Sequence, residues 1–157
     1  IDFVKKNIDI AKKHAKSSNL KINYFQNNLS NLKLKSKFDL ILILEVIEHL
    51  DNWKEVSLEA IKYLKPNGKI IFSSINRTFF SKIFAIFLSE EILKWTPKNT
   101  HTYQKLVKPE ELIKHLEKNK MKKTDLSGMF FNPISRDWQI SKKRTRINYF
   151  CTFKKIS

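Results

Sequence analysis

A short apolar run that leads directly into a charged turn, residues 38–50, constrains the fold of this chain more than any other stretch. The run from Leu40 to Leu44 is too short for a free-standing helix and is typical of a strand buried on both faces of a parallel sheet. Glu45, Glu48 and His49 follow at i, i+3 and i+4, so a helical turn would place them on one face. Because open α/β sheets bind ligands just past the carboxyl ends of their strands, these three side chains mark the candidate site.

Segments with strand-like and helix-like spacing alternate through the first half of the chain. The apolar spacing predicts helices over about residues 4–17 and 51–64 and strands over 20–26, 38–44 and 69–75. Proline and glycine in Lys65-Pro66-Asn67-Gly68 separate the second helix from the strand that follows. This order of elements predicts an α/β fold with a parallel sheet and right-handed crossovers.

The second half of the chain departs from that pattern. Residues 79–95 carry large apolar side chains at helical spacing. This fits either a helix buried against the sheet or a lid that contacts a greasy substrate or a membrane surface. A helix that opens at Pro109 and two closing strands, 121–131 and 147–153, follow. We expect one domain over residues 1–157, with the helical lid inserted at about 78–107.

The net charge of +16 favours anionic partners, either nucleic acid or an acidic membrane face. The basic residues are scattered, apart from Lys142-Lys143-Arg144, so a lysine-rich compositional bias is the simpler interpretation. The single cysteine, Cys151, cannot form an internal disulfide, which fits a reducing compartment. No run approaches the roughly 18 apolar residues of a membrane span.

Asp2 follows an apolar residue and precedes the first predicted helix. An acidic residue at such a strand end binds ribose hydroxyls in nucleotide-binding folds, with a glycine-rich turn about 20 residues upstream. That turn would precede the first residue of this chain. The alternative is that Asp2 only provides a favourable negative charge near the start of the helix.

Several short blocks resemble a known class of proteins. Residues 44–50, after the apolar strand, resemble the post-strand motif of class I S-adenosylmethionine-dependent methyltransferases. Residues 64–69 are similar to the "LKPGG" turn of that class, with Asn67 in place of the first glycine. Four further blocks, in the same order, resemble the ubiquinone biosynthesis O-methyltransferase family. They are Ser73-Ser74-Ile75-Asn76-Arg77, Pro97-Lys98-Asn99-Thr100-His101, Lys108-Pro109-Glu110-Glu111-Leu112 and Gly128-Met129-Phe130-Phe131-Asn132-Pro133.

The resemblance implies a Rossmann-like class I methyltransferase sheet, mostly parallel with an antiparallel last strand. It implies that the chain is amino-terminally truncated and lacks the first strand and the glycine-rich loop. The implied enzyme is an S-adenosyl-L-methionine-dependent O-methyltransferase of the 3-demethylubiquinol 3-O-methyltransferase or 2-polyprenyl-6-hydroxyphenol methylase type. Its substrates would be polyprenylated phenols and catechols of ubiquinone biosynthesis. An enzyme that acts on such lipid-soluble substrates would be cytoplasmic, peripheral to the inner membrane and in contact with anionic lipid. Nucleic acid is the less favoured partner, because Asn132-Pro133 is followed by Ile134-Ser135 and does not form the Asn-Pro-Pro-Tyr-type motif of enzymes that act on a flipped base.

The resemblance also assigns residues. It implies cofactor binding by Asp2, at the ribose, and by Leu44, where the family has a cofactor-contacting residue. The Glu-x-x-Glu-His group is read as a Mg²⁺ site in that family, which carries over to Glu45, Glu48 and His49. Oxygen ligands suit Mg²⁺ better than imidazole does, so catalysis by His49 as the general base is the alternative. Another small-molecule or nucleic-acid methyltransferase of this fold, or a non-catalytic fragment, also stays open.

Overall fold

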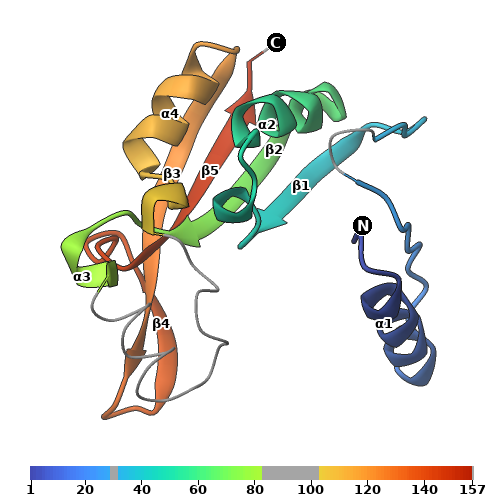
Figure 1. Ribbon diagram of the computed structural model, residues 1–157, viewed down its shortest axis with the longest axis horizontal. Helices are drawn as coiled ribbons and strands as arrows, with labels where there is room; N and C mark the ends of the chain where they lie inside the picture. The colour runs from blue at the N-terminus through green and yellow to red at the C-terminus, as the bar shows by residue number, and fades with distance from the viewer. Residues whose placement is uncertain (29–31, 83–102, 157) are drawn as a thin grey trace. The chain divides into compact units, whose positions relative to one another are not determined.

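The computed structural model describes residues 1–28, 32–82 and 103–156 (Figure 1). The chain divides into two compact units, Ile1–Lys35 and Ser36–Ser157, and each is described by itself. The first unit contains helix α1 (Lys5–Ser17), which confirms the first predicted helix. The predicted strand over 20–26 is wrong, because only an isolated parallel bridge joins Asp2 to Gln26. A strand needs a partner along its length, and one bridging residue does not form a ladder.

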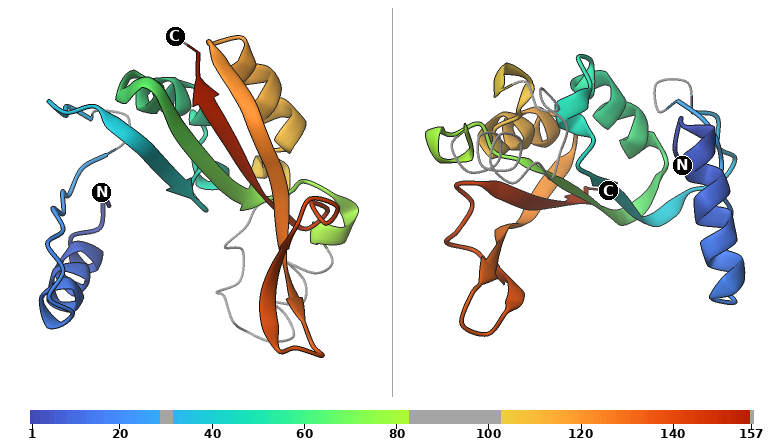
Figure 2. Two further views of the ribbon diagram at one scale, coloured as in Figure 1. Left: turned by 180° about the vertical axis from the view of Figure 1, so that it is seen from behind. Right: turned by 60° about the horizontal axis from the view of Figure 1, so that its bottom comes forward.

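The second unit is a five-stranded sheet with helices on it. Its strands have the spatial order β1-β2-β5-β3-β4. They are β1 (Phe38–Leu44), β2 (Leu64–Ile75), β3 (Met121–Asn132), β4 (Asp137–Ser141) and β5 (Asn148–Lys155). The helices are η2 (Ile47–His49), α2 (Trp53–Lys62), α3 (Phe79–Ser81), η4 (Tyr103–Lys105) and α4 (Pro109–Glu117). Figures 1 and 2 show α2 and α4 on the same face of the sheet.

The directions of the strands differ from the prediction in one respect. Among the described strands only β1 and β2 are parallel, and β5 pairs antiparallel with both β2 and β3. The α/β class and the antiparallel last strand are confirmed, whereas the expectation of a mostly parallel sheet is wrong for this unit. The reason is the position of β5. Because β5 lies between β2 and β3, its reversed direction makes two neighbouring pairings antiparallel.

The core of this unit lies between the sheet and the helices α2 and α4. Leu112 and Leu116 of α4 are fully buried, as are Phe72 of β2 and Phe153 of β5, whose rings pack edge to face at 6.2 Å. The prediction that β1 is buried on both faces is wrong within this unit. Successive side chains of a strand point to opposite faces. Ile43 therefore packs into the core while its neighbours on the other face are exposed.

The region predicted as a lid is described only at its borders. Residues 79–81 form α3, which begins with a capping box between the Thr78 and Ser81 side chains. Residues 83–95 of the predicted helix, and the block Pro97-Lys98-Asn99-Thr100-His101, lie outside the described residues. Within the described ranges, no helix is long and apolar enough to cross a membrane. The predicted helix at Pro109 is confirmed as α4, with Pro109 in its first turn.

Candidate active site

The parallel pairing of β1 and β2 brings two polar segments to one edge of the sheet. Leu44, the last residue of β1, pairs with Ser73 of β2, so Glu45 begins its turn beside the second strand. Glu45 has a φ of 52°, in the left-handed region, and this ends the strand. Its backbone N–H donates to the Ser73 carbonyl oxygen at 3.1 Å. The Ser73 hydroxyl donates to Oε1 of Glu45 at 2.6 Å, which fixes the carboxylate over the end of β2.

The turn after Glu45 does not form the α-helical face that the spacing predicted. Residues 47–49 form a single 3-10 turn, and Val46 before it has φ −124°. The three predicted ligands therefore differ in environment: Glu48 is buried, whereas Glu45 and His49 are exposed. Among the described residues no group of three or more His, Cys, Asp or Glu side chains is placed to hold a metal ion. The assignment of all three residues to a metal stays a prediction.

Glu48 is the most unusual group of the site. Only 3% of the residue is exposed, and neither carboxylate oxygen has a hydrogen-bond partner among the described residues. Burial, together with the smaller effect of the nearby negative charge of Glu45, raises the pKa of this carboxyl to about 8. A buried charge without partners is costly, so this carboxyl is stable either protonated or beside a cation. The paired carboxyls Glu45 and Glu48 thus provide a place to hold a proton or a cation.

The floor beneath this pair is polar but fully buried. Ser73, Ser74 and Tyr149 are all buried there, and the Tyr149 hydroxyl donates to the Val107 carbonyl oxygen at 3.1 Å. Burial raises the pKa of Tyr149, and the charges of Cys151 and Glu48 add to that shift. Tyr149 therefore stays neutral over the physiological range and acts as a hydrogen-bond donor that joins β5 to the segment before α4.

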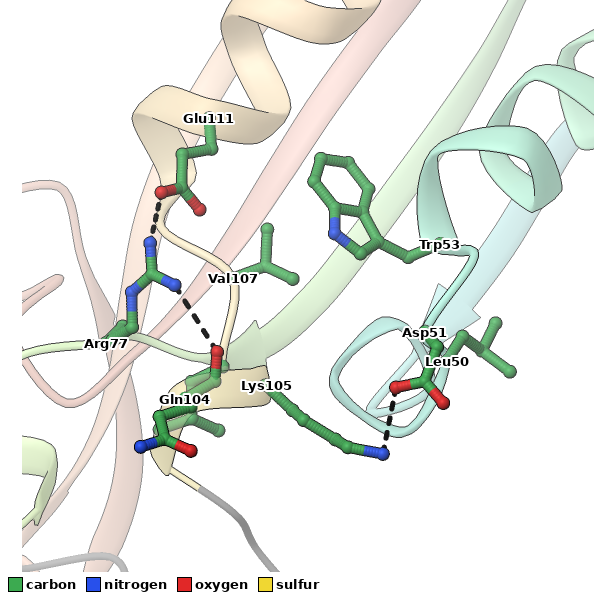
Figure 3. Close-up of a pocket in the computed structure, with 9 residues that line it drawn as sticks. Leu50, Asp51, Trp53, Arg77, Gln104, Lys105, Val107 and Glu111 are labelled. Carbon is green, nitrogen blue, oxygen red and sulfur yellow. Dashed lines mark hydrogen bonds and ion pairs between the residues drawn. The ribbon is translucent and has the colours of Figure 1, made fainter.

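A cavity of about 200 Å³ opens directly after the Glu-x-x-Glu-His turn, lined by residues that include Leu50 and Asp51 (Figure 3). Two ion pairs connect residues that line this cavity. The Arg77 guanidinium, just past β2, donates to the Glu111 carboxylate of α4 and to the Gln104 carbonyl oxygen. Lys105 pairs with Asp51 at 2.9 Å. In Figure 3 the Trp53 ring forms an apolar part of the same wall.

These lining residues were not among the predicted site residues. Arg77 stood in the Ser73–Arg77 block that carried the family resemblance, so that block was the available signal. Gln104 and Val107, at the end of the predicted lid, gave no comparable signal, because only the folding of the chain brings them to the cavity.

Asp2 belongs to the first unit. Its Oδ1 accepts from the Val4 N–H at 2.7 Å, and its Oδ2 accepts from the Asn7 amide at 3.0 Å. These hydrogen bonds hold the pKa of Asp2 below its usual value, so the carboxylate is charged and oriented. Leu44 ends β1 with its side chain exposed. The roles of Asp2 and Leu44 in cofactor binding stay predictions.

Comparison with known proteins gives this site a family context. Residues 1–72 match the family model described as "Methyltransferase domain". The ubiquinone biosynthesis O-methyltransferase of Rickettsia bellii (strain OSU 85-389) is 38% identical over 155 residues, which cover 99% of this chain and 65% of that protein. The protein of the same name from Pelagibacter ubique is 43% identical over 155 residues, which cover 99% of this chain and 64% of that protein. Over nearly its whole length the chain is similar in sequence to the ubiquinone biosynthesis O-methyltransferases. It spans slightly less than two thirds of their length.

Solved structures confirm the fold class. A possible histamine N-methyltransferase from Thermotoga maritima aligns with a TM-score of 0.72 at 18% identity, over 96% of this chain and 70% of that one. The N-methyltransferase NodS from Bradyrhizobium japonicum, in complex with S-adenosyl-L-homocysteine, aligns with a TM-score of 0.64 at 16% identity, over 99% of this chain and 65% of that one. The chain has the fold of class I methyltransferases, and the predicted family resemblance is confirmed.

Proposed function

We propose that the complete protein is an S-adenosyl-L-methionine-dependent O-methyltransferase that methylates ring hydroxyls of polyprenylated phenols or catechols in ubiquinone biosynthesis. The observation that carries the proposal is the match to ubiquinone biosynthesis O-methyltransferases along 99% of the chain. The geometry adds a pair of carboxyls at the edge where this fold binds its ligands. The cavity that follows the Glu-x-x-Glu-His turn has Trp53 and charged side chains in its wall, which suits a hydroxylated ring.

The proposed cofactor site begins with Asp2. Its carboxylate is charged and already oriented by Val4 and Asn7, and a ribose offers two hydroxyl donors to such an acceptor. S-adenosyl-L-methionine supplies an electrophilic methyl group when bound. Leu44 would contribute apolar contact at the carboxyl end of β1, where its exposed side chain is available.

On the acceptor side, the residues after β1 would remove or hold a proton. Methyl transfer to oxygen needs the hydroxyl deprotonated and aligned, and positioning supplies much of the rate. Glu45 and Glu48 supply hard oxygen donors, and the unpartnered oxygens of Glu48 fit a divalent cation such as Mg²⁺. Such an ion would lower the pKa of a bound catechol. His49 is exposed beside them and is the alternative general base.

A polyprenylated substrate resides in a bilayer, so we also propose that the enzyme acts at the cytoplasmic side of the inner membrane by peripheral contact with anionic lipid. The net charge of +16 supports this proposal. Nucleic acid is not a proposed partner, because the sequence relatives are named for a small-molecule pathway.

The test uses the full-length protein, a short-tailed catechol and radiolabelled S-adenosyl-L-methionine. We expect methyl transfer to the ring hydroxyl, and no transfer to any catechol or phenol would overturn the proposal. Asp2→Ala should weaken cofactor binding in calorimetry by about tenfold or more, the scale of a lost hydrogen bond to a charged group. Asp9→Ala is the matched control, since Asp9 is an exposed acid on α1 of the same unit.

The metal assignment has a separate test. Mg²⁺ should raise the melting temperature of the parent protein, and Glu48→Gln or Glu45→Gln should reduce that rise, because carboxylate oxygens are its proposed ligands. Glu55→Gln, at an exposed site on α2, is the control. Full methyl transfer in excess chelator, together with its loss in His49→Ala, would reject the metal and assign the general base to His49.

A further inference from the structure

The β3–β4 hairpin, residues 128–141, extends beyond the body of the sheet. β3 pairs with β5 as far as Ser127 and with β4 from Gly128 to Asn132. Beyond Ser127 the ribbon is therefore two-stranded, and Figures 1 and 2 show it projecting away from the other strands. An isolated two-stranded ribbon is only marginally stable in water, so contact on one of its faces would stabilise it.

One face of this hairpin is apolar and open. Cross-strand partners point to the same face, and Phe131 pairs with Trp138 while Met129 pairs with Ile140. The Phe131 and Trp138 rings pack edge to face with centroids 5.6 Å apart. Trp138 is 65% exposed, Ile140 is 71% exposed, and Ile134 in the connecting turn is 93% exposed. Such a contiguous group of large apolar side chains is the usual sign of an interaction surface.

Basic side chains gather at the base of this hairpin. Between residues 128 and 147 the sequence has five basic residues and one acid, Asp137. The Arg144 guanidinium lies 4.0 Å from the centre of the Phe130 ring, and Arg146 lies 5.3 Å from that of Phe80. With Lys143 they line a cavity of about 370 Å³ at the base of the hairpin. The wall of that cavity thus combines cations with aromatic rings.

The combination of apolar and basic side chains on the hairpin favours one kind of binding partner over another. A second copy of the same surface would bring two clusters of like charge together, in a protein whose net charge is already +16. A bilayer with anionic lipid offers the complementary pair: acyl chains for the aromatic and aliphatic residues, and phosphates for the cations. Tryptophan is enriched at the membrane–water boundary, and each basic residue near an anionic surface strengthens binding by roughly fivefold.

We propose that the β3–β4 hairpin is a membrane-docking surface, which inserts Ile134, Phe131 and Trp138 into the interfacial layer of an anionic bilayer while Lys143 and Arg144 contact lipid phosphates. It is separate from the apolar segment 79–95. The inference deepens the proposed function, because it rests on a lipid-soluble substrate for its purpose. Its test does not depend on methyl transfer.

The experiment measures co-sedimentation of the full-length protein with vesicles of phosphatidylcholine, with and without phosphatidylglycerol. We expect the parent to bind the anionic vesicles and Ile134→Asp with Trp138→Ser to bind at least about tenfold less, through lost apolar contact. Ile156→Asp is the control, because Ile156 is an exposed apolar residue elsewhere on the same unit. Lys143→Glu should weaken binding about fivefold or more, whereas Lys122→Glu, the same charge change in the body of β3, should have a smaller effect.

The fluorescence of Trp138 can also show whether this side chain inserts into the bilayer. Brominated lipid should quench the fluorescence of the parent more than that of Trp138→Phe, because the proposed surface places this ring among the lipids.

Equal vesicle binding by the parent and a folded Ile134→Asp/Trp138→Ser variant would overturn the proposal. So would a change from dimer to monomer in that variant with vesicle binding unchanged, which would assign the surface to self-association. If the variant still methylates a soluble short-tailed acceptor, docking and catalysis are separate, and loss of vesicle binding alone supports the docking role. A parent that binds vesicles without methyl transfer contradicts only the proposed function.

Discussion

Replacing Glu48 by glutamine should change how the stability of this protein depends on pH. The Glu48 carboxyl is 3% exposed, and neither oxygen has a hydrogen-bond partner among the described residues. Its pKa is raised from 4.5 to about 8 in the folded protein, by burial first and by the Glu45 charge second. The folded state therefore binds this proton more tightly than the unfolded state does, and the free energy of unfolding falls as the pH rises from 4.5 to 8.

The magnitude follows from the two pKa values. Each pKa unit corresponds to about 1.4 kcal/mol, so the parent should lose roughly 4 kcal/mol of stability through Glu48 between pH 5 and pH 8.5. Glu48→Gln cannot ionise and lacks this loss. The amide still leaves polar atoms buried, which costs about 1–3 kcal/mol at every pH. The variant should therefore be similar to the parent or less stable at pH 5, and more stable at pH 8.5.

The assay is urea unfolding at half-unit steps from pH 5 to 8.5, with a chelator present so that no divalent ion binds the carboxyls. The difference in unfolding free energy between the variant and the parent should change by roughly 4 kcal/mol over that range. For Glu55→Gln, at an exposed position on α2, the profile of unfolding free energy against pH should run parallel to that of the parent. Parallel profiles for Glu48→Gln and the parent would refute the reasoning, because they would show that Glu48 titrates alike in both states.

Three further substitutions test contacts of the fold, each measured as a shift in the urea midpoint at constant slope. Gly128→Ala should destabilise the fold by about 1–3 kcal/mol, because the new methyl group would lie 1.9 Å from the Arg144 carbonyl oxygen. Gly68→Ala should cost less, since its methyl group would lie 3.0 Å from the nearest atom. A larger loss of stability for Gly68→Ala than for Gly128→Ala would contradict this packing. Tyr149→Phe should cost about 1 kcal/mol by removing the hydrogen bond from its buried hydroxyl to the Val107 carbonyl oxygen, and an unchanged midpoint would argue against that bond. Arg77→Gln should cost about 1 kcal/mol or less, since its ion pair is partly exposed; a loss of several kcal/mol would mean that Arg77 supports more of the cavity than its two contacts.

Local patterns in the sequence predicted the elements that depend on local chemistry. The apolar run 38–44 formed a strand, and Pro109 began a helix. The strand β4 was missed, because only two closing strands, over residues 121–131 and 147–153, were predicted. The pairing of Phe131 with Trp138 shows that the turn closes a hairpin instead. The alternation in Asp137–Ser141 is too short to decide between these two outcomes without the partner strand.

For the candidate site, the sequence predicted the position of the residues but not their environments. The sequence indicated that Glu45, Glu48 and His49 follow a strand, and the structure confirms that position. The sequence could not indicate the different environments of these three side chains. Those environments depend on the left-handed conformation of Glu45 and on a 3-10 turn where an α-helical turn was expected. That geometry buries Glu48 while Glu45 and His49 stay exposed.

This difference also affects how the two carboxyls, Glu45 and Glu48, would act in the proposed reaction. A carboxyl with a pKa of about 8 keeps its proton at neutral pH, so Glu48 is a poor base until a cation or a conformational change lowers that pKa. Glu45 is held by the Ser73 hydroxyl and is exposed to an incoming ligand. If Glu45 and Glu48 together hold a divalent ion, Glu48 would have to lose its proton to act as a ligand. Ion binding would then release about one proton at neutral pH, and Glu48→Gln would abolish the release. Calorimetry of Mg²⁺ binding in buffers of different ionisation enthalpy measures that proton directly. Binding without proton release would mean that Glu48 is not a ligand.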